Sequence, residues 1–172
     1  DGVDVSILYP TVGLFLYRLP DGDLASALFR VYNDWLAKFC SSVPDRLKGI
    51  AMINTDDVAA SVRELERCAD MGLVGAMISV YPPEERSYNS PEYAPLWEAA
   101  ERHALPLSLH ISTNRPSPGK ELPQFVTQPP AYMCNVDYWV RMSLAHIILS
   151  GVFERHPKLQ VGSVEQETSW VP

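Results

Sequence analysis

Polar side chains suited to small-molecule chemistry accompany three of the apolar runs in this 172-residue sequence. Asn54 comes just after the run at 47–53, and Glu165 comes just after the run at 159–164. His110 stands inside another run, PLSLHIST, close to the polar turn that follows it. An imidazole at that place is either a core histidine hydrogen-bonded to a neighbour or a group that binds a ligand or moves protons. The elements that position these residues decide between the two interpretations.

Short apolar runs alternate along the chain with segments whose apolar residues recur at helical spacing. The runs predict five β-strands, at 3–9, 47–53, 73–80, 106–113 and 159–164. The segments between them predict helices at about 24–43, 58–71, 91–103 and 137–155. Asp23 is expected to cap the first helix, and Gly72 is expected to end the second.

Apolar stripes on these helices indicate which side chains should face the core. The stripe of the first helix consists of Leu24, Leu28, Val31, Trp35 and Phe39. The stripe of the second helix consists of Val58, Val62, Leu65 and Ala69. Because they lie on such stripes, three tryptophans are predicted to be core residues, namely Trp35, Trp97 and Trp139.

The alternation of strands and helices, with nearly continuous apolar strands, is typical of a parallel sheet in an α/β architecture. Two closures fit this pattern, a doubly wound open sheet and a (β/α)8 TIM barrel. No predicted strand is followed by a G-x-G-x-x-G or G-x-x-x-x-G-K-[ST] motif, the usual mark of nucleotide-binding open sheets. In barrels, the carboxyl ends of the strands carry the catalytic residues. The polar strand ends therefore favour a barrel, with about five βα units visible.

The composition is that of an ordinary globular domain, with 47% hydrophobic and 20% charged residues. A net charge of −7 argues against nucleic acid or an anionic membrane as a partner, because both select a basic surface. No apolar run is long enough to span a membrane, and no signal peptide is recognised. Three widely spaced cysteines without a C-x-x-C pair indicate buried thiols in a reducing cytoplasm. They are Cys40, Cys68 and Cys134.

Several motifs in the same order resemble the amidohydrolase-related family of metal-dependent TIM barrels. The resemblance is strongest to the branch of aminocarboxymuconate-semialdehyde decarboxylase and the resorcylate-type decarboxylases. It rests on the stretches GVDV, YPT, YNDWLA, PDRLKG, LSLH and SGVFERHPKL, which begin at positions 2, 9, 32, 44, 107 and 150. Together they extend over essentially the whole chain.

This resemblance implies a divalent metal, zinc in most cases and manganese in some, at the carboxyl end of the barrel. His110 matches the histidine that ends the fifth strand in the family, which makes it a metal ligand. Where many family decarboxylases carry another histidine, this chain has Glu165, followed by Trp170. Glu165 is then a metal ligand or a general base for water, or else a structural carboxylate paired with an arginine. The departure leaves hydrolysis open beside decarboxylation.

The remaining histidines are predicted to be structural: His103 on a helix, His156 in a turn and His146 as a satisfied packing residue. Asn33 and Asp34 are characteristic of the family, but their helical position predicts hydrogen bonding within the fold rather than catalysis. Each of these side chains lies away from the predicted strand ends.

The chain is expected to be one partial barrel domain, 1–172, because a complete (β/α)8 barrel needs roughly 250 residues. The metal-binding motif of the family's first strand and the aspartate of its last strand have no counterpart here. A proline-rich loop at 115–136, with Phe125 and Tyr132, is predicted to cover the barrel mouth or to contact a second subunit of a dimer. The expected function is decarboxylation or hydrolysis of a small carboxylated or cyclic substrate. The alternative is a non-catalytic remnant or an oligomerising module.

Overall fold

The computed structural model describes residues 2–117, 120, 130, 133–168 and 170–171. Its centre is one parallel sheet of five strands in the order β1-β2-β3-β4-β5. The strands are β1 (Ser6–Leu8), β2 (Leu47–Met52), β3 (Gly75–Ile78), β4 (Leu107–His110) and β5 (Val161–Val164). All five predicted strands are present, each shorter than its apolar run. Because the strands are parallel, their carboxyl ends meet at one edge of the sheet.

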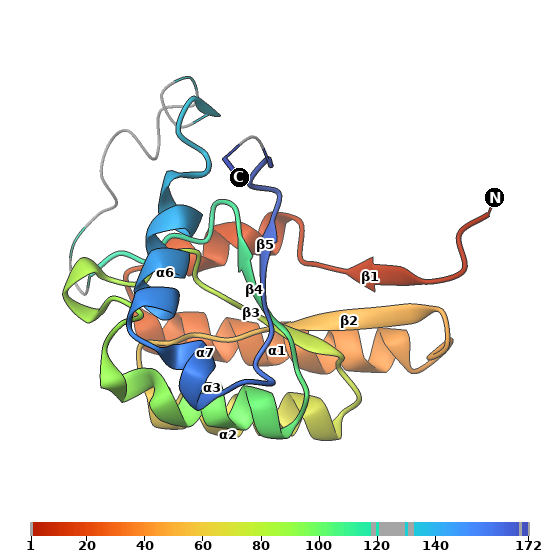
Figure 1. Ribbon diagram of the computed structural model, residues 1–172. Helices are drawn as coiled ribbons and strands as arrows, with labels where there is room; N and C mark the ends of the chain where they lie inside the picture. Colours follow the sequence, from red (N-terminus) through yellow and green to blue (C-terminus); the bar gives the residue numbers. More distant parts are fainter. Residues whose placement is uncertain (1, 118–119, 121–129, 131–132, 169, 172) are drawn as a thin grey trace.

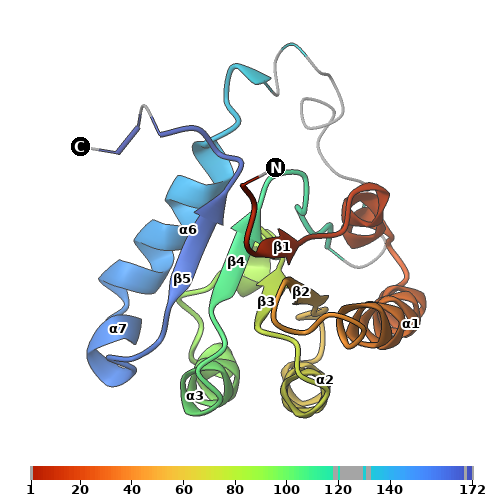
Figure 2. The same cartoon turned by 90° about the vertical axis from the view of Figure 1, so that its right-hand side faces the viewer.

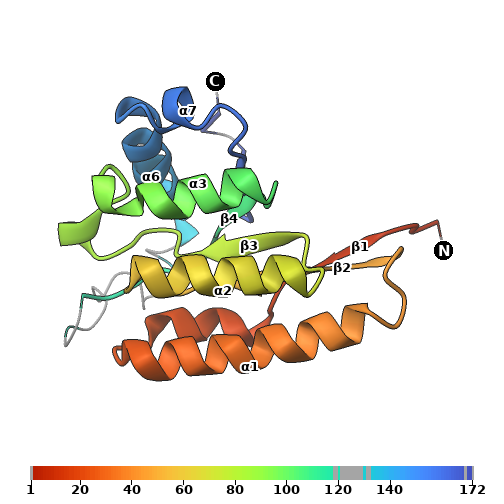
Figure 3. The same ribbon diagram turned by 90° about the horizontal axis from the view of Figure 1, so that it is seen from below.

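The helices lie around the outer side of the curled sheet, as Figure 2 shows, and α1, α2 and α3 run side by side in Figure 3. Their bounds are α1 (Gly22–Cys40), α2 (Val58–Asp70), α3 (Ala94–Arg102), α6 (Tyr138–Leu149) and α7 (Val152–Arg155). The described connections also contain the 3-10 helices η1 (Val12–Arg18), η2 (Glu84–Arg86) and η3 (Pro91–Tyr93). Each of the first two connections thus contains a helix between parallel strands, as a barrel requires.

Local signals explain where several helices begin and end. The side chain of Asp21, rather than the predicted Asp23, accepts the N-cap hydrogen bond of α1, and Asp57 caps α2. Gly72 follows α2 with a φ of 87°, a left-handed conformation that glycine adopts without strain. Gly151, with a φ of 73°, divides the single helix predicted at 137–155 into α6 and α7.

The main core lies between the sheet and its helices. Outward-facing strand residues such as Ala76, Ile78 and Leu109 pack there against helix residues such as Leu65 and Trp97. A second, smaller cluster joins η1 and α1 to β2 and β3 and consists of Tyr17, Phe29, Ile50, Met52 and Met77. Alternate strand residues therefore face two different environments, which is the pattern of a sheet buried on both faces.

The predicted inward stripe of α1 is wrong. Trp35 is 56% exposed and Val31 is 67% exposed, so neither belongs to the core. The buried line lies one or two positions further along and consists of Ala25, Phe29, Asn33, Leu36 and Cys40. Asn33 explains the rotation: its amide donates to the Met52 carbonyl and accepts from the Met52 N–H, which fixes this side of α1 against β2. Trp97 is buried as predicted, and Trp139 is partly buried.

The predictions for the cysteines are only partly confirmed, and the prediction for the loop after β4 is not tested. Cys40 and Cys68 are buried thiols, as predicted, but Cys134 is exposed. Most of the 115–136 loop, with Phe125 and Tyr132, lies outside the described residues, so its covering role stays a prediction. Within the described part of the chain, no helix combines the length and apolarity that crossing a membrane requires.

Candidate metal centre

His110 and Glu165 lie side by side at the carboxyl edge of the sheet. His110 is the last residue of β4 and pairs in register with Val164, the last residue of β5, which Glu165 follows directly. Figures 1 and 2 show these two strands as neighbours. The fold thus brings together two of the three polar residues that the sequence singled out at strand ends.

The His110 ring is oriented by its own backbone neighbour. Its Nδ1 lies 3.0 Å from the Ile111 carbonyl oxygen. A carbonyl oxygen only accepts, so the contact assigns a proton to Nδ1, and in the neutral ring with this tautomer the lone pair lies on Nε2. An imidazole held in this way by a backbone carbonyl is the arrangement that metal-binding histidines use. His110 is 3% exposed, so its ring has little freedom to turn.

The second ring nitrogen faces a carboxylate. His110 Nε2 lies 3.7 Å from Glu165 Oε2. Two ligand atoms that are each about 2.1 Å from one ion lie roughly 3.0 to 3.5 Å apart in octahedral or tetrahedral geometry. The pair therefore fits one divalent ion after a shift of a few tenths of an ångström. No third histidine, cysteine or carboxylate joins them among the described residues, so the pair alone does not make a complete metal site.

Glu165 is an exposed side chain on an unusual backbone conformation. Its side chain is 70% exposed, and its φ of 57° is left-handed, a conformation uncommon for a residue with a side chain. Strain of this kind gathers at functional sites. Within the described residues, the ion pairs include no arginine partner for Glu165, which a structural interpretation requires, and the ring of His110 faces this carboxylate.

Tyr9 is a neighbour that the sequence analysis did not single out. Its ring lies 5.4 Å from the His110 ring, and its hydroxyl forms a 2.8 Å hydrogen bond with the Ser108 hydroxyl. Tyr9 follows β1 directly, so it reaches the same edge of the sheet as His110. Tyr9 is the last residue of the predicted strand at 3–9, so a search for polar groups at the ends of the strands would have found it.

The turn after β4, residues 111–115, is held at several points. The Thr113 hydroxyl donates to the His110 carbonyl and accepts from the Val80 N–H, both at 2.7 Å. Arg18 donates through Nε to the carbonyl of Ser112, whose φ of 67° is left-handed. We call this segment the β4 turn.

Arg115 ends the β4 turn with an ion pair in which the arginine is buried and the Asp56 side chain is 25% exposed. Its side chain is 3% exposed and binds both oxygens of Asp56, with Nε at 2.9 and 3.1 Å and Nη2 at 2.5 Å. Its Nη1 donates to the carbonyls of Tyr17 and Leu19. Burial alone would raise the pKa of Asp56, but the hydrogen bonds and charge of Arg115 outweigh it and hold the pKa below its usual value.

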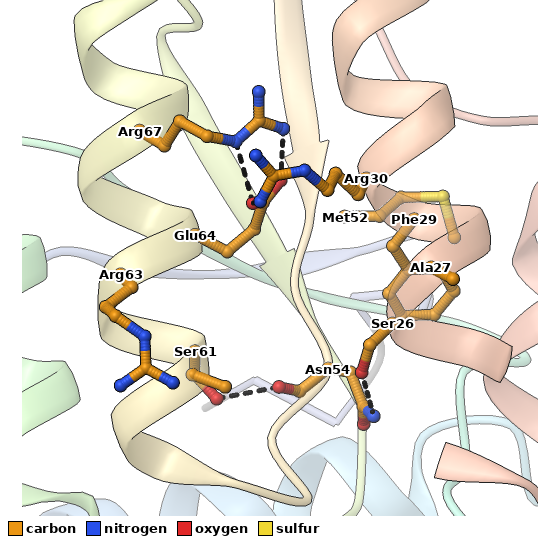
Figure 4. A pocket seen from close by; sticks show the side chains of 11 residues that line it. Ser26, Ala27, Phe29, Arg30, Met52, Asn54, Ser61, Arg63, Glu64 and Arg67 are labelled. Carbon is orange, nitrogen blue, oxygen red and sulfur yellow. Dashed lines mark hydrogen bonds and ion pairs between the residues drawn. The ribbon is translucent and has the colours of Figure 1, made fainter. Parts of the chain in front are cut away.

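Asn54, the third strand-end residue, does not join His110. Its amide donates to the Gly22 carbonyl, the Ser26 hydroxyl and Asp56. It lines a groove of about 410 Å³ between α1 and α2, which Figure 4 shows.

The polar groups of this groove are largely committed to one another. Arg67 binds both oxygens of Glu64 and also Asp34, and the Ser61 hydroxyl donates to the Asn54 carbonyl. Glu64 also accepts from Asn33. Asn33 and Asp34 therefore form hydrogen bonds within the fold, as predicted. Few polar groups of the groove are left free for chemistry.

The other histidines lie apart from the strand ends. His103 faces Glu66 at 3.9 Å, and His156 Nδ1 faces Glu101 at 3.4 Å. His146 packs against the ring of Tyr81, with 6.1 Å between centroids. Its buried Nδ1 finds no hydrogen-bond partner in the described part of the chain. The prediction that the polar atoms of His146 are satisfied is therefore wrong.

Comparison with known proteins identifies the family and the fold of the chain. Residues 12–162 match the family model described as Amidohydrolase. A gamma-resorcylate decarboxylase from Rhizobium radiobacter is 30% identical over 155 residues, which cover 83% of this chain and 45% of that protein. The corresponding enzyme from Rhodococcus jostii is 27% identical, with 83% and 46% covered. The chain thus spans about half the length of the curated relatives it matches.

Solved structures give the same result. The crystal structure of 2,6-dihydroxybenzoate decarboxylase from Rhizobium has a TM-score of 0.73 at 27% identity and covers 94% of this chain and 51% of that one. A 5-carboxyvanillate decarboxylase from Novosphingobium aromaticivorans, with bound manganese, has a TM-score of 0.76 at 27% identity and covers 94% and 45%. The prediction of a TIM barrel of the metal-dependent hydrolase type, with five strands present, is confirmed. With most of its length matched by the family model, the chain belongs to the amidohydrolase family.

Proposed function

We propose that this chain forms the His110 and Glu165 side of a divalent-metal site in a decarboxylase that acts on a small carboxylated aromatic substrate. The observation that carries the proposal is the His110 ring, whose Nδ1 is tied to Ile111 and whose Nε2 faces Glu165 at 3.7 Å. The relatives support the substrate class, since their names specify resorcylate, dihydroxybenzoate and carboxyvanillate.

In this proposal, each residue has a distinct role. A bound divalent ion supplies Lewis-acid polarisation of the substrate. His110 holds the ion through Nε2. In decarboxylation, the bond between a ring carbon and the carboxylate breaks, carbon dioxide leaves, and the ring carbon takes up a proton. Glu165, exposed and next to the ion's ligand, can carry that proton as a general acid.

Hydrolysis is the second candidate, and the identity of Glu165 favours it. A carboxylate beside a metal-binding histidine can also act as a general base towards water. The distinction lies in the product: hydrolysis adds water across a bond, whereas decarboxylation releases carbon dioxide.

The finer features of the proposal concern the ion, the assembly and the compartment. Zinc and manganese both suit a histidine and a carboxylate, and solved relatives hold manganese. The proposal keeps zinc as the first candidate and manganese as the second. A homodimer and a cytoplasmic location complete it; the acidic composition and the unpaired cysteines support the latter.

The test uses the complete gene product with any coding sequence that flanks residues 1–172. Elemental analysis should find stoichiometric zinc or manganese, and a panel of hydroxybenzoates should release carbon dioxide. His110→Ala should lose the metal and the activity while its circular dichroism spectrum stays that of the wild type. His103→Ala, outside the site, is the matched control. Full metal occupancy in His110→Ala would refute the ligand role, and a metal-free wild type would favour a non-catalytic remnant.

A further inference from the structure

The direction of the His110 ring depends on the backbone of the β4 turn. The acceptor of its Nδ1 proton is the carbonyl of the next residue, Ile111, at 3.0 Å. Ser112 then takes a left-handed φ of 67°. A side chain that bonds to the adjacent peptide turns with that peptide. Whatever fixes the β4 turn therefore also fixes the lone pair on Nε2.

Arg115 fixes the far end of this turn. Its backbone N–H donates to the Tyr81 carbonyl at 3.0 Å, which holds the turn against the segment after β3. Its side chain reaches in the other direction, to the Tyr17 carbonyl at 3.0 Å and to Asp56. One buried residue thus ties the β4 turn to η1 and to the segment after β2.

Asp56 is the partner that sets the direction of the guanidinium. Both of its oxygens accept from Arg115, and the Asn54 amide donates to Oδ2 at 3.2 Å. Its carbonyl accepts from Arg86, which is itself paired with Glu92. A two-pronged pair of a planar guanidinium and a carboxylate permits essentially one relative orientation. Ion pairs of this kind often add more to specific geometry than to net stability.

We propose that Arg115, held by Asp56, is a positioning residue: it fixes the β4 turn so that the Ile111 carbonyl keeps the His110 ring in its Nδ1-protonated, metal-binding orientation. The inference rests on the proposed metal role of His110. Outer partners of metal-binding histidines typically change metal affinity by about 10–100-fold. Arg115 acts one step further away, through the β4 turn. Replacing its guanidinium group is therefore expected to weaken metal binding by roughly 10-fold.

The experiment measures the ring and the metal separately in the complete protein. Arg115→Met removes the planar guanidinium group, and Arg115→Lys keeps only its charge. Asp56→Asn keeps the size of the partner side chain and removes its charge. In the metal-free protein, ¹⁵N chemical shifts of the His110 ring report which nitrogen carries the proton. Mn²⁺ titration of the same samples gives the dissociation constant. Arg102→Met, which removes an exposed ion-paired arginine, and Leu36→Ala, which only destabilises the remote core, are the controls.

The expected result is a mixed tautomer of His110 in Arg115→Met and Asp56→Asn, with Mn²⁺ binding about 10-fold weaker. Arg115→Lys should lie between these variants and the wild type, and both controls should keep wild-type shifts and affinity. A purely structural role would instead give Arg115→Met the same profile as Leu36→Ala, which would overturn the proposal. If Arg115→Met does not fold, Arg115→Lys and Asp56→Asn decide by the same criterion.

The two readouts also separate this inference from the proposed function. If His110→Ala retains Mn²⁺, the metal role of His110 fails, but the tautomer in the metal-free protein still tests the positioning role. If His110→Ala loses Mn²⁺ and the Arg115 variants keep both the wild-type tautomer and the wild-type affinity, the positioning role alone is refuted.

Discussion

Two polar clusters lie along the carboxyl edge of the sheet, and they differ in how completely their groups are paired. At the end of β2, Asp56 receives hydrogen bonds from Arg115 and Asn54, and the Arg115 side chain is 3% exposed. At the ends of β4 and β5, Glu165 is 70% exposed, and the His110 Nε2 that faces it is 3.7 Å away, beyond hydrogen-bond distance. The polar groups of the first cluster are hydrogen-bonded to one another, so we call it the saturated cluster. The facing groups of the second cluster are not hydrogen-bonded to each other.

This difference separates architecture from chemistry. A saturated pair has no free lone pair or proton to offer, so its contribution is to hold segments together. A lone pair on a fixed imidazole next to an exposed carboxylate is available to an ion or a substrate. Both clusters lie near strand ends, so position alone does not show which of them is suited to chemistry. The degree of satisfaction of each polar group distinguishes them.

The largest expected effect on stability comes from breaking the saturated cluster. Asp56→Ala leaves the buried Arg115 charge without its carboxylate, which should lower the free energy of unfolding by about 3 kcal/mol. Chemical denaturation monitored by circular dichroism measures it. Glu66→Ala, which breaks an exposed pair with Arg102, is the control and should cost less than about 1 kcal/mol. Equal effects of the two variants would show that the Asp56 pair is no more structural than a surface pair.

A smaller effect of the same pair should appear as pH dependence. The pKa of Asp56 is lower in the folded protein, where Arg115 and Asn54 outweigh the effect of burial, than in the unfolded chain. Its contribution to stability should therefore be complete above about pH 5, begin to decline near pH 4, where an unperturbed aspartate takes up a proton, and be lost as the pH falls through the lower folded-state pKa. Unfolding free energies of wild type and Asp56→Asn, measured from pH 7 to 3, should converge on acidification. A constant difference would contradict the lowered pKa.

The sequence predicted the strands and the place of His110 at the end of one of them, because both depend on local signals. Continuous apolar runs marked all five strands, and an imidazole beside the following turn marked His110. The rotation of α1 was not predictable in this way, since two adjacent apolar stripes compete on that helix and Trp35 belongs to the exposed one. The buried amide of Asn33 makes the choice, through hydrogen bonds to Met52 that exist only after the helix docks.

The saturated cluster was missed for a related reason. Arg115 and Asp56 are 59 residues apart in the chain, and each stands in a polar segment that looks like an ordinary turn. Nothing local distinguishes a buried arginine from an exposed one. Their pairing follows from the fold, which brings the segments after β2 and β4 together around η1.

The smallest effect on stability should come from a substitution in the second cluster, at Glu165. This variant tests most directly whether that cluster serves chemistry rather than architecture. Glu165→Gln keeps the size of an exposed side chain and removes only its charge, so the free energy of unfolding should change by no more than about 0.5 kcal/mol. Function should change far more than stability. If Glu165 carries a proton, the variant keeps its metal and kcat falls by roughly 100-fold or more, because general acid–base catalysis is worth that much. If Glu165 is a metal ligand, metal content falls together with activity. A Glu165→Gln enzyme with wild-type metal content and wild-type kcat would remove this residue from the site and leave His110 as the chain's contribution.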